Sequence, residues 1–558
     1  MEIVIQVRNL EAVETALGLE ADGIAAPLPE AAGKEWRSGA AALRAAARRH
    51  GVSFYLDWDR LVVEGAQPQA RESLAAITEL APDGLRIRDL GIFREARRRY
   101  PGLRLQTAAG WGCQNSLGLR VAETLGCNRV VLGGPTELKE VALMMRESPL
   151  ALEVVLPPAC GGFPGLCLLP DYLGVDCDSC PGPGQPEESR AGAWIAALER
   201  LPALAQLGVA AVQIRGAVSR ETLSQLMELY RMVLAAPIRD RAKILAAARE
   251  VLTAFGERFE PVASDPEKPP GTALRGEHPG KGRAPVSPVR PRRESSQKRS
   301  RTWLETRGYA EAAVLAREWP GPMVVPLTPA NYGAFLPELR RWGPGKRLIW
   351  RLPRVIRQAA IGFHRQAVAT LRTAGYRRFV ASDWGAAVLV HDLGGEVYGD
   401  ETLGVRNLWA LEAGQTLGVR HFCLPPGPKP DSWQLLVEGA PPGSFWGYFY
   451  HTPPLSVYSG TGGAFPAKVP GGLAGQRLRW VQEEDLFCLR PAAPVSLERF
   501  RDWLEDRGIS PLLWALPGSG LAWGQVPEKL RRGPGDRIEK RTPLSGRKKP
   551  QGGEKLPK

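Results

Sequence analysis

Histidine and methionine are scarce in this 558-residue chain, which has six of each, and there are eight cysteines. Neither His-Glu-x-x-His nor Gly-x-Ser-x-Gly occurs, which excludes two of the commonest hydrolase signatures. No run of about 18 uncharged apolar residues is present, so we expect no membrane span. The segment Met1–Arg8 lacks the basic and long apolar regions of a secretory signal, so we expect a soluble cytoplasmic protein. In a reducing compartment, clustered cysteines more often bind metal or take part in chemistry than form disulfides.

The formal net charge of +14 is concentrated in two segments, because residues 264–301 carry +6 and residues 528–558 carry +7. Both segments are rich in Pro, Gly and Ser and have no hydrophobic periodicity. We therefore predict a basic disordered linker at 262–301 and a basic disordered tail at 526–558. Flexible basic segments attract polyanions such as RNA through counterion release, so contact with RNA is one interpretation of these segments. A solubilising linker and tail is the other, because charge alone does not specify a partner.

The first 240 residues alternate short β-rich runs with longer helical patterns, which is typical of parallel βαβ units. The predicted strands are Ile3–Val7, Gly23–Ala26, Ser53–Leu56, Gly84–Ile87, Leu103–Thr107, Arg129–Leu132, Leu152–Leu156 and Ala211–Ile214. Helical patterns include Leu10–Leu19, Ala40–His50, Ser116–Leu125 and, after the last strand, Arg220–Ala248. Eight such strands close a (β/α) barrel whose reactive groups lie at the carboxyl ends of the strands. The sequence therefore predicts an α/β, TIM-barrel-like domain over residues 1–240.

A second, barrel-like α/β unit is predicted at 302–436, because it contains an echo of the first. The echo pairs Asp89-Leu-Gly91 with Asp383-Trp-Gly385, and Asn115 (eleven residues before Gly126) with Asn407 (eleven before Gly418). A hydrophobic strand follows in both copies, which indicates a duplicated unit, with chance similarity between two βα units as the alternative. Residues 437–525 are richer in Gly, Pro and aromatics. We predict a smaller β-rich region there, with a helix from Ser496 to Arg507.

Four thiols fall within 21 residues directly after the predicted strand Leu152–Leu156, and they are Cys160, Cys167, Cys177 and Cys180. The loop that carries them is rich in Gly and Pro, so it can wrap around a metal and point backbone N–H groups at sulfur. Four thiolates suit either tetrahedral zinc or an iron–sulfur cluster. Only Cys177 and Cys180 form the close pair that is common in zinc sites, and the looser spacing of the other two favours a cluster. Free or partly used thiols are the third interpretation.

The chain resembles the collagenase-like peptidase U32 family in its long form. The family's hallmark is a glutamate before a Cys-x6-Cys pair and then a further cysteine-bearing loop, and Glu153, Cys160 and Cys167 match it in type and spacing. Other similar segments are Asn9-Leu-Glu-Ala-Val, Asp89-Leu-Gly91, Leu105 through Asn115, Leu352-Pro-Arg-Val-Ile and Val397-Tyr-Gly-Asp400. The resemblance covers most of residues 1–240 and 345–515.

This resemblance implies a barrel-like fold and one of two activities. Several family members hold a 4Fe–4S cluster on four cysteines and take part in oxygen-independent hydroxylation of tRNA or rRNA bases, or of a quinone precursor. Others are described as proteases that act on collagen. We expect the iron–sulfur chemistry, with zinc as the alternative cofactor. A collagenase-like protease and a non-catalytic RNA-binding relative are the alternative functions.

Several family positions differ in this chain. The departures are Val155 for Phe, Pro157-Pro158 for His-Gly, Gln106 and Gly110 for His and Gln, and Gln213-Ile-Arg-Gly-Ala217 for Lys-Ile-Glu-Gly-Arg. The loop between the second and third cysteines is also shorter. In members whose fourth ligand lies further downstream, the matching stretch here contains Trp194 and no cysteine, so Cys177 and Cys180 must both ligate in a full set. The ligand set can survive these changes while the substrate chemistry differs.

Four more residues are candidates for function. Glu153 is the tentative catalytic residue, as a general base, and its alternative is a salt bridge at a strand end. Asn115 is the tentative substrate-binding residue, and its alternative is a helix N-cap. Asp383 and Asp400 are expected at strand ends of the second unit, as site residues or loop caps. Among the scattered cysteines, Cys127 and Cys423 are expected in the core.

Overall fold

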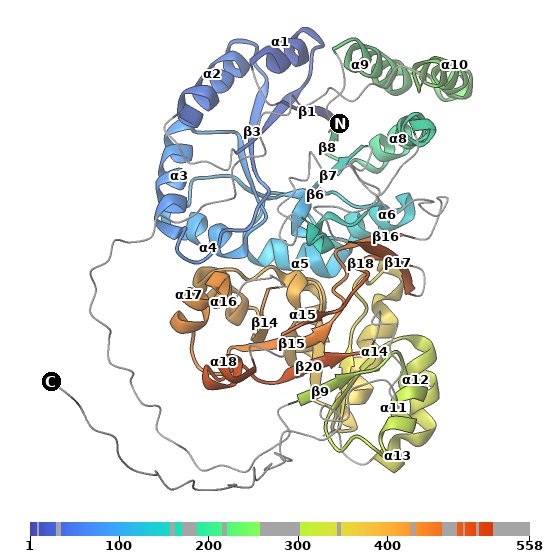
Figure 1. Ribbon diagram of the computed structural model, residues 1–558. Coiled ribbons are helices and arrows are strands. Elements are labelled where there is room, and N and C mark those ends of the chain that lie inside the picture. Colours follow the sequence, from blue (N-terminus) through green and yellow to red (C-terminus); the bar gives the residue numbers. More distant parts are fainter. Residues whose placement is uncertain are drawn as a thin grey trace, which may run out of the picture.

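The computed structural model describes residues 1–7, 10–28, 35–156, 162–169, 187–214, 220–256, 302–342, 347–425, 431–459, 477–483, 486–497 and 501–516. The predicted linker and tail lie outside these ranges. The described chain forms two barrels, one above the other in Figure 1, with the N-terminal barrel at the top.

The first barrel is closed by parallel strands in the order β1 to β8, and β8 pairs back to β1. The strands are β1 (Glu2–Gln6), β2 (Gly23–Pro27), β3 (Ser53–Trp58), β4 (Gly84–Ile87), β5 (Leu105–Thr107), β6 (Arg129–Leu132), β7 (Ala151–Val155) and β8 (Ala211–Ile214). The barrel predicted from the strand–helix alternation is therefore confirmed, with strand ends within about two residues of the expected positions.

Helices follow the strands and cover the outside of this barrel (Figure 1). They are α1 (Leu10–Gly18), α2 (Glu35–Arg49), α3 (Gln67–Leu80), α4 (Leu90–Arg99), α5 (Ser116–Thr124), α6 (Leu138–Glu147), α8 (Glu187–Leu207), α9 (Arg220–Ala235) and α10 (Ile238–Gly256), with short 3-10 turns η1 (Ala109–Trp111) and η2 (Pro164–Leu166). The single helix predicted at Arg220–Ala248 is two helices, because Pro237 lies between α9 and α10 and has no N–H to continue the helical ladder.

The second barrel is also closed and parallel, and it uses strands from two distant segments. They are β9 (Thr302–Glu305), β10 (Met323–Pro326), β11 (Leu348–Arg351), β12 (Arg378–Ala381), β13 (Glu396–Gly399), β14 (Val419–Cys423), β15 (Phe445–His451) and β20 (Leu512–Ala515). Closure runs from β14 through β15 and β20 to β9. The predicted boundary at 436/437 therefore does not separate two units, because β15 and β20 are the last two strands of the barrel.

The β-rich part of the C-terminal segment is a small antiparallel sheet of β16 (Ser456–Ser459), β18 (Leu486–Pro491) and β17 (Leu478–Glu483). A two-residue strand, β19 (Val495–Ser496), pairs with β15. The helix predicted from Ser496 to Arg507 does not begin at Ser496, because this residue pairs with Tyr450 in the strand. The helix that follows is α18 (Arg501–Asp506).

The remaining helices of the second half surround its barrel. They are α11 (Tyr309–Leu315), α12 (Pro329–Phe335), α13 (Leu339–Trp342), α14 (Ile361–Thr373), α15 (Trp384–Asp392), α16 (Leu408–Thr416) and α17 (Asp431–Gly439), with turns η3 (Leu336–Glu338), η4 (Gln358–Ala360) and η5 (Glu401–Leu403). No described helix combines the length and apolar character that crossing a bilayer requires.

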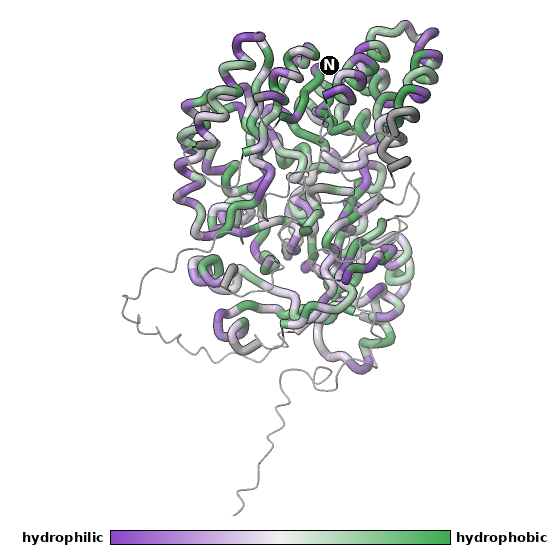
Figure 2. The backbone as a smooth tube through the Cα atoms, turned by 45° about the horizontal axis from the view of Figure 1, so that its top comes forward, coloured by the Kyte–Doolittle hydropathy of each residue, from purple (hydrophilic) through white to green (hydrophobic). Residues whose placement is uncertain are grey.

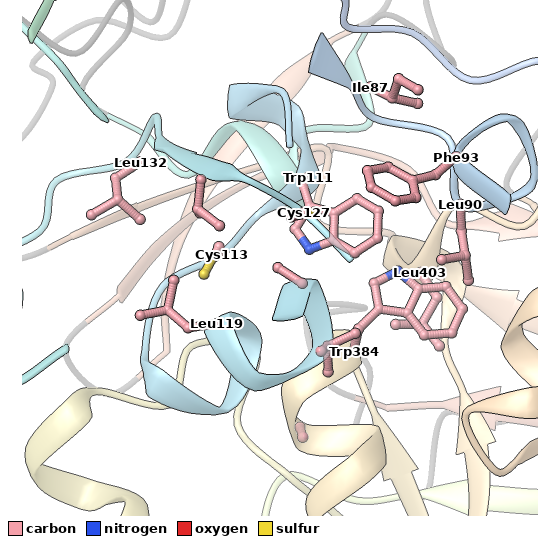
Figure 3. Packing of buried hydrophobic residues seen from close by; sticks show 14 of the residues in the cluster. Ile87, Leu90, Phe93, Trp111, Cys113, Leu119, Cys127, Leu132, Trp384 and Leu403 are labelled. Atoms are coloured by element: carbon pink, nitrogen blue, oxygen red, sulfur yellow. The ribbon is translucent and has the colours of Figure 1, made fainter. Parts of the chain in front are cut away.

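One apolar core runs through both barrels. Figure 3 shows Trp384 of α15 and Leu403 of η5 beside Leu90, Phe93 and Trp111 of the first barrel. Figure 2 shows hydrophilic stretches along the peripheral helices. Burial of a continuous apolar surface between the two halves fixes their relative position.

Candidate functional site

The carboxyl-terminal mouths of the two barrels face each other. Helices α4 and α5 begin just after β4 and β5, and they contact α16 and α15, which begin after the corresponding strands of the second barrel. Reactive groups of (β/α) barrels lie at the carboxyl ends of the strands. The seam between the barrels therefore contains the helix-start residues Asp89, Asn115, Asp383 and Asn407.

The echoed motifs are helix caps, and they form this seam. Asp89 caps α4 and Asp383 caps α15, while Asn115 caps α5 and Asn407 caps α16. The pairing is crossed, because α4 lies against α16 and α5 lies against α15. The two halves thus meet as a pseudo-twofold pair, which confirms the duplicated barrel-like unit that the echo predicts.

Both the oxygen and the nitrogen of the Asn115 side-chain amide form hydrogen bonds with other residues of the protein. Its amide oxygen accepts from the backbone N–H groups of Leu117 and Gly118 at 3.0 and 3.1 Å, and its amide nitrogen donates to the carbonyl of Ile356 at 2.8 Å. The side chain is buried. These contacts make Asn115 a cap and a bridge between the barrels, and its predicted contact with substrate stays a prediction.

Glu153 lies at the centre of a charged cluster inside the first barrel. Its carboxylate accepts from Arg86 at 2.8 Å and from Arg129 at 3.2 Å. Arg86 also contacts Asp57 at 3.3 Å and donates to Gln106 at 3.2 Å. Glu153 and Arg86 are both fully buried. Arg129 also pairs with Glu2 at 3.0 Å, so each guanidinium group has two carboxylate partners, and no buried charge of the cluster is left unpaired.

This cluster adds two arginines that the sequence alone did not single out. Arg86 and Arg129 stand in ordinary strand patterns, and only the closure of the barrel brings them onto Glu153. Gln213 is also fully buried, and its side-chain amide has no hydrogen-bond partner among the described residues.

The cysteine-bearing loop begins directly after β7, at the mouth of the first barrel. Of the four predicted ligands, Cys160, Cys177 and Cys180 lie outside the described residues. Cys167 is half-buried, and its carbonyl accepts from Arg88 at 3.4 Å. Among the described residues, no group of three or more His, Cys, Asp or Glu could hold a metal. The predicted ligand set therefore stays a prediction.

The described part of this loop, residues 162–169, is held by the small sheet of the second half. The N–H of Phe163 donates to the carbonyl of Val457 at 2.9 Å, and the N–H of Leu168 donates to that of Leu455 at 2.8 Å. Cys167 packs against an apolar cluster that includes Leu455. Residues far apart in the chain thus fix the backbone on both sides of Cys167.

The other four cysteines are buried thiols in the core. Cys113 and Cys127 lie in the first barrel (Figure 3), and Cys423 and Cys488 lie in the second half. Burial raises the pKa of the Cys113 and Cys488 thiols to about 12, and it raises those of the other two as well. A thiol with a raised pKa is a poor nucleophile at neutral pH, so these four are structural residues.

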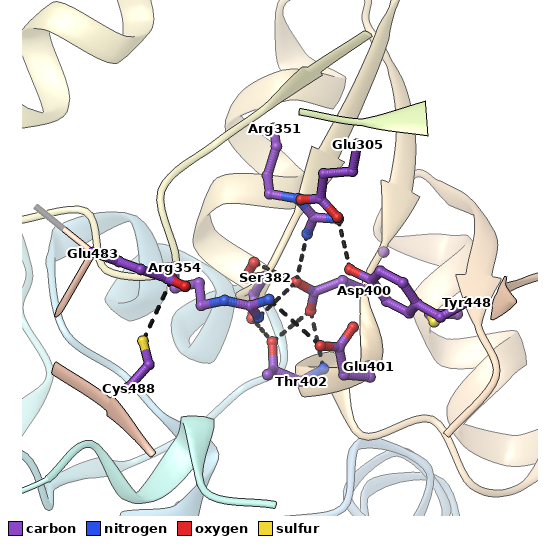
Figure 4. Close-up of polar contacts among 12 residues, drawn as sticks. Glu305, Arg351, Arg354, Ser382, Asp400, Glu401, Thr402, Tyr448, Glu483 and Cys488 are labelled. Atoms are coloured by element: carbon purple, nitrogen blue, oxygen red, sulfur yellow. Dashed lines mark hydrogen bonds and ion pairs between the residues drawn. The ribbon is translucent and has the colours of Figure 1, made fainter. Parts of the chain in front are cut away.

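Asp400 is the centre of a second polar cluster, at the mouth of the second barrel (Figure 4). Its carboxylate accepts from Arg351 at 3.1 Å, from Arg354 at 3.2 Å and from the hydroxyl of Ser382 at 2.5 Å. It also caps η5 by accepting from the N–H of Thr402 at 3.0 Å.

Asp383 is a plain helix cap, and burial raises the pKa of its carboxyl to about 6.

Residues 38–183 match the family model described as Peptidase family U32. Similar solved structures include the U32 peptidase Mk0906 (16% identity over 28% of this chain and 68% of that chain, TM-score 0.24). Another is thiamine phosphate pyrophosphorylase from Pyrococcus furiosus (15% identity over 45% of this chain and 95% of that chain, TM-score 0.25). A third is the YdjI aldolase from Escherichia coli K12 (11% identity over 47% of this chain and 91% of that chain, TM-score 0.26). No curated protein matches the chain. The first barrel contains the matched region, so this part of the chain is similar to peptidase family U32.

Proposed function

We propose that this chain is an iron–sulfur-dependent enzyme, or an accessory factor, for the oxygen-independent hydroxylation of RNA or of a small aromatic molecule. The observation that carries the proposal is the place of the four-cysteine loop. It leaves the carboxyl end of β7, which is the position of reactive groups in (β/α) barrels. The described part of the loop, residues 162–169, makes backbone hydrogen bonds to the second half.

The described end of the loop is compatible with a cluster ligand. Cys167 is half-buried next to apolar side chains of the small sheet. Backbone hydrogen bonds of Phe163 and Leu168 hold the chain on both sides of it. Low solvent access and fixed backbone geometry are features that tune protein-bound iron–sulfur clusters. With Cys160, Cys177 and Cys180 it would complete four thiolates. A bound 4Fe–4S cluster would supply one-electron redox chemistry at this mouth.

The chain's own residues would shape the site around that group. The small sheet of β16, β17 and β18 would shield Cys167, which packs against the apolar cluster of Leu455, Leu478 and Leu489. Arg88 donates to the backbone carbonyl of Cys167 and so places a cation beside this one described cysteine. Glu153 is held between Arg86 and Arg129, which favours a structural role for it over a general-base role. The basic segments at 264–301 and 528–558 support RNA as the substrate.

The first test is metal content after anaerobic purification of the full chain. We expect about four iron and four sulfide per chain and a broad visible absorption. Cys167→Ser should lose most of the iron, whereas Cys127→Ser, a change in the core of the same barrel, should retain it. A colourless protein with stoichiometric zinc, or with no metal, would contradict the proposal.

The second test identifies the reaction. RNA from cells that lack the gene should lose a base modification equal in mass to one added oxygen, and the wild-type gene should restore it. Cleavage of gelatin or collagen that a substitution at Glu153 or Cys160 abolishes would instead support the protease alternative. RNA retained on a metal-loaded protein that modifies nothing would support the non-catalytic one.

A further inference from the structure

Helix α4 and the turn that follows it carry a concentration of positive charge on the outside of the first barrel. Residues 94–104 contain five arginines and one glutamate, a net charge of +4, whereas the chain outside the two predicted flexible segments is nearly neutral. Arg94 is paired with Glu412 of α16 at 2.8 Å. The other four arginines, together with Arg71 of the neighbouring helix α3, form a group that we call the arginine flank: Arg71, Arg97, Arg98, Arg99 and Arg104.

Three arginines of the flank share a single carboxylate. Glu95 accepts from Arg71 at 3.3 Å, from Arg98 at 2.9 Å and from Arg99. The Glu95 side chain is only 6% exposed, whereas the three arginine side chains are 47%, 60% and 40% exposed. One carboxylate can neutralise one of these cations, so the excess positive charge lies at the surface.

The remaining two arginines of the flank have no carboxylate partner among the described residues. Arg97 donates to backbone carbonyls, of which one belongs to Gly126 at the end of α5. Arg104 is exposed in the turn after α4. The exposed acids of α3, Glu72 and Glu79, lie within the described chain and form no ion pair with any arginine of the flank. The flank therefore combines five cations with one buried anion.

Helix stability accounts for only part of this charge. Arg97, Arg98 and Arg99 occupy the last turn of α4, where a cation interacts favourably with the helix dipole. That interaction contributes about 0.3–1 kcal/mol and falls off within the last turn. Like charges this close together also repel one another, which destabilises the folded chain. A bound polyanion would relieve that repulsion.

The chemistry of the flank favours phosphate groups in a nucleic acid. All five cations are arginines, whose planar guanidinium groups donate two parallel hydrogen bonds to phosphate oxygens. Tyr100, between Arg99 and Arg104, is half-buried and adds an aromatic ring of the kind on which a base can stack. In α3, in α4 and in the turn to Arg104, all of them described, no large apolar side chain is exposed for insertion into a membrane.

We propose that the arginine flank binds the phosphodiester backbone of RNA. This inference rests on the proposed function and narrows it, because it takes RNA rather than a small aromatic molecule as the partner. Helix α4 starts at the mouth of the first barrel, where the cysteine loop also begins. A helix of ten residues is about 15 Å long, so an RNA strand held on the flank can extend to that mouth.

The test is the salt dependence of RNA binding by the full chain, followed by the fluorescence anisotropy of a labelled single-stranded RNA. Each lost phosphate contact should make the slope of log K against log salt concentration less steep by about 0.7. The double variant Arg98→Gln/Arg99→Gln should therefore change the slope by about 1.4 and weaken binding about tenfold at low salt, equally for different RNA sequences. The control is Arg239→Gln/Arg249→Gln on α10, which removes two exposed arginines that each have an acid of their own and should leave the slope unchanged.

Cross-linking of the wild-type chain to RNA that contains 4-thiouridine is a second measurement and needs no variant. We expect cross-links within residues 94–104, with Tyr100 among them. Equal slopes in the two double variants, or cross-links confined to residues 264–301 and 528–558, would overturn the proposal. Binding to phosphatidylserine vesicles that requires Arg98 and Arg99, with RNA binding unchanged by their loss, would also overturn it, in favour of a lipid surface.

Metal content separates this proposal from the iron–sulfur proposal. The iron and sulfide content of Arg98→Gln/Arg99→Gln should equal that of the wild type, since the flank is remote from the cysteine loop. Weaker RNA binding by the variant, with no metal in either protein, would refute the iron–sulfur proposal and support the flank. Normal metal content with unchanged RNA binding would do the reverse.

Discussion

The side-chain amide of Asn407 donates a hydrogen bond of 3.0 Å to the carboxylate of Asp89, 318 residues earlier in the chain. Each of the two residues also caps its own helix, by accepting from backbone N–H groups of Ala410 and Ile92. Asp89 is fully buried, and burial raises the pKa of its carboxyl. The helix caps of one half are therefore also the contacts that join it to the other half.

Removal of this contact should destabilise the seam. Asn407→Ala loses the bond to Asp89, a bond of 2.7 Å to the carbonyl of Val62 and the cap of α16. We expect a loss of about 2–4 kcal/mol in the free energy of unfolding, measured by urea denaturation. Thr328→Ala removes a cap that does not cross the seam and should cost about 1 kcal/mol. Equal losses in the two variants would mean that the bridging bonds contribute nothing.

Gly91 is required by close approach of the two halves. A Cβ at this position would lie 2.4 Å from the backbone nitrogen of Ala410, and one at Gly385 would lie 2.7 Å from that of Gly118. Gly91→Ala should therefore lower the melting temperature by several degrees, since about 1–3 kcal/mol of overpacking strain is expected. The control is Gly362→Ala in α14, where nothing lies within 4 Å and a gain of about 0.5–1 kcal/mol is expected. If Gly91→Ala left the melting temperature unchanged, the two helices would be able to move apart without cost.

The charged cluster of the first barrel should be a structural unit. Glu153→Gln leaves Arg86 and Arg129 with one carboxylate fewer in a dry interior, and we expect a loss of about 3–5 kcal/mol in urea denaturation. The matched control is Glu412→Gln, which breaks an exposed pair with Arg94 and should cost less than about 1 kcal/mol. Unchanged stability of Glu153→Gln together with lost activity would instead identify Glu153 as a catalytic base.

His451 should make the second barrel sensitive to acid. Burial lowers the pKa of its imidazole to about 3, and Arg490, Arg354 and Arg351 act in the same direction. The unfolded chain takes up this proton near pH 6.5, so the contribution of His451 to stability is complete above that pH and is lost as the pH falls toward 3.

The measurement compares urea denaturation at pH 7.0 and 5.0. The wild-type protein should lose about 2 kcal/mol more than His451→Gln over this interval, from the linkage of about 1.4 kcal/mol per pH unit below 6.5. The exposed histidine His50 is the control, and His50→Gln should behave as the wild type does. If His451→Gln lost as much stability as the wild type, its imidazole would have to be protonated in the folded state.

The sequence by itself determined the elements and their order. The spacing of apolar residues and the positions of turn-forming residues predict the strands of the first barrel, because burial patterns and backbone preferences act over a few residues. A cap was a recognisable alternative for Asn115 for the same reason, since a cap satisfies N–H groups two or three residues away. Asp89 and Asn407 were visible in the sequence only as members of the internal echo. The family's cysteine spacing was also visible, and residues 38–183 match that family.

Tertiary structure decided what those elements do together. Closure of the first barrel brings Arg86 and Arg129 into contact with Glu153. Closure of the second barrel uses β15 and β20, which belong to a segment whose local sequence predicts a separate β-rich region. The crossed meeting of the two halves turns helix caps into an interface. Glu401, His451 and Trp433 line one small cavity at the mouth of the second barrel although nothing in their local sequence links them. These are contacts between residues distant in the chain, and their energies depend on burial and distance, which no local pattern encodes.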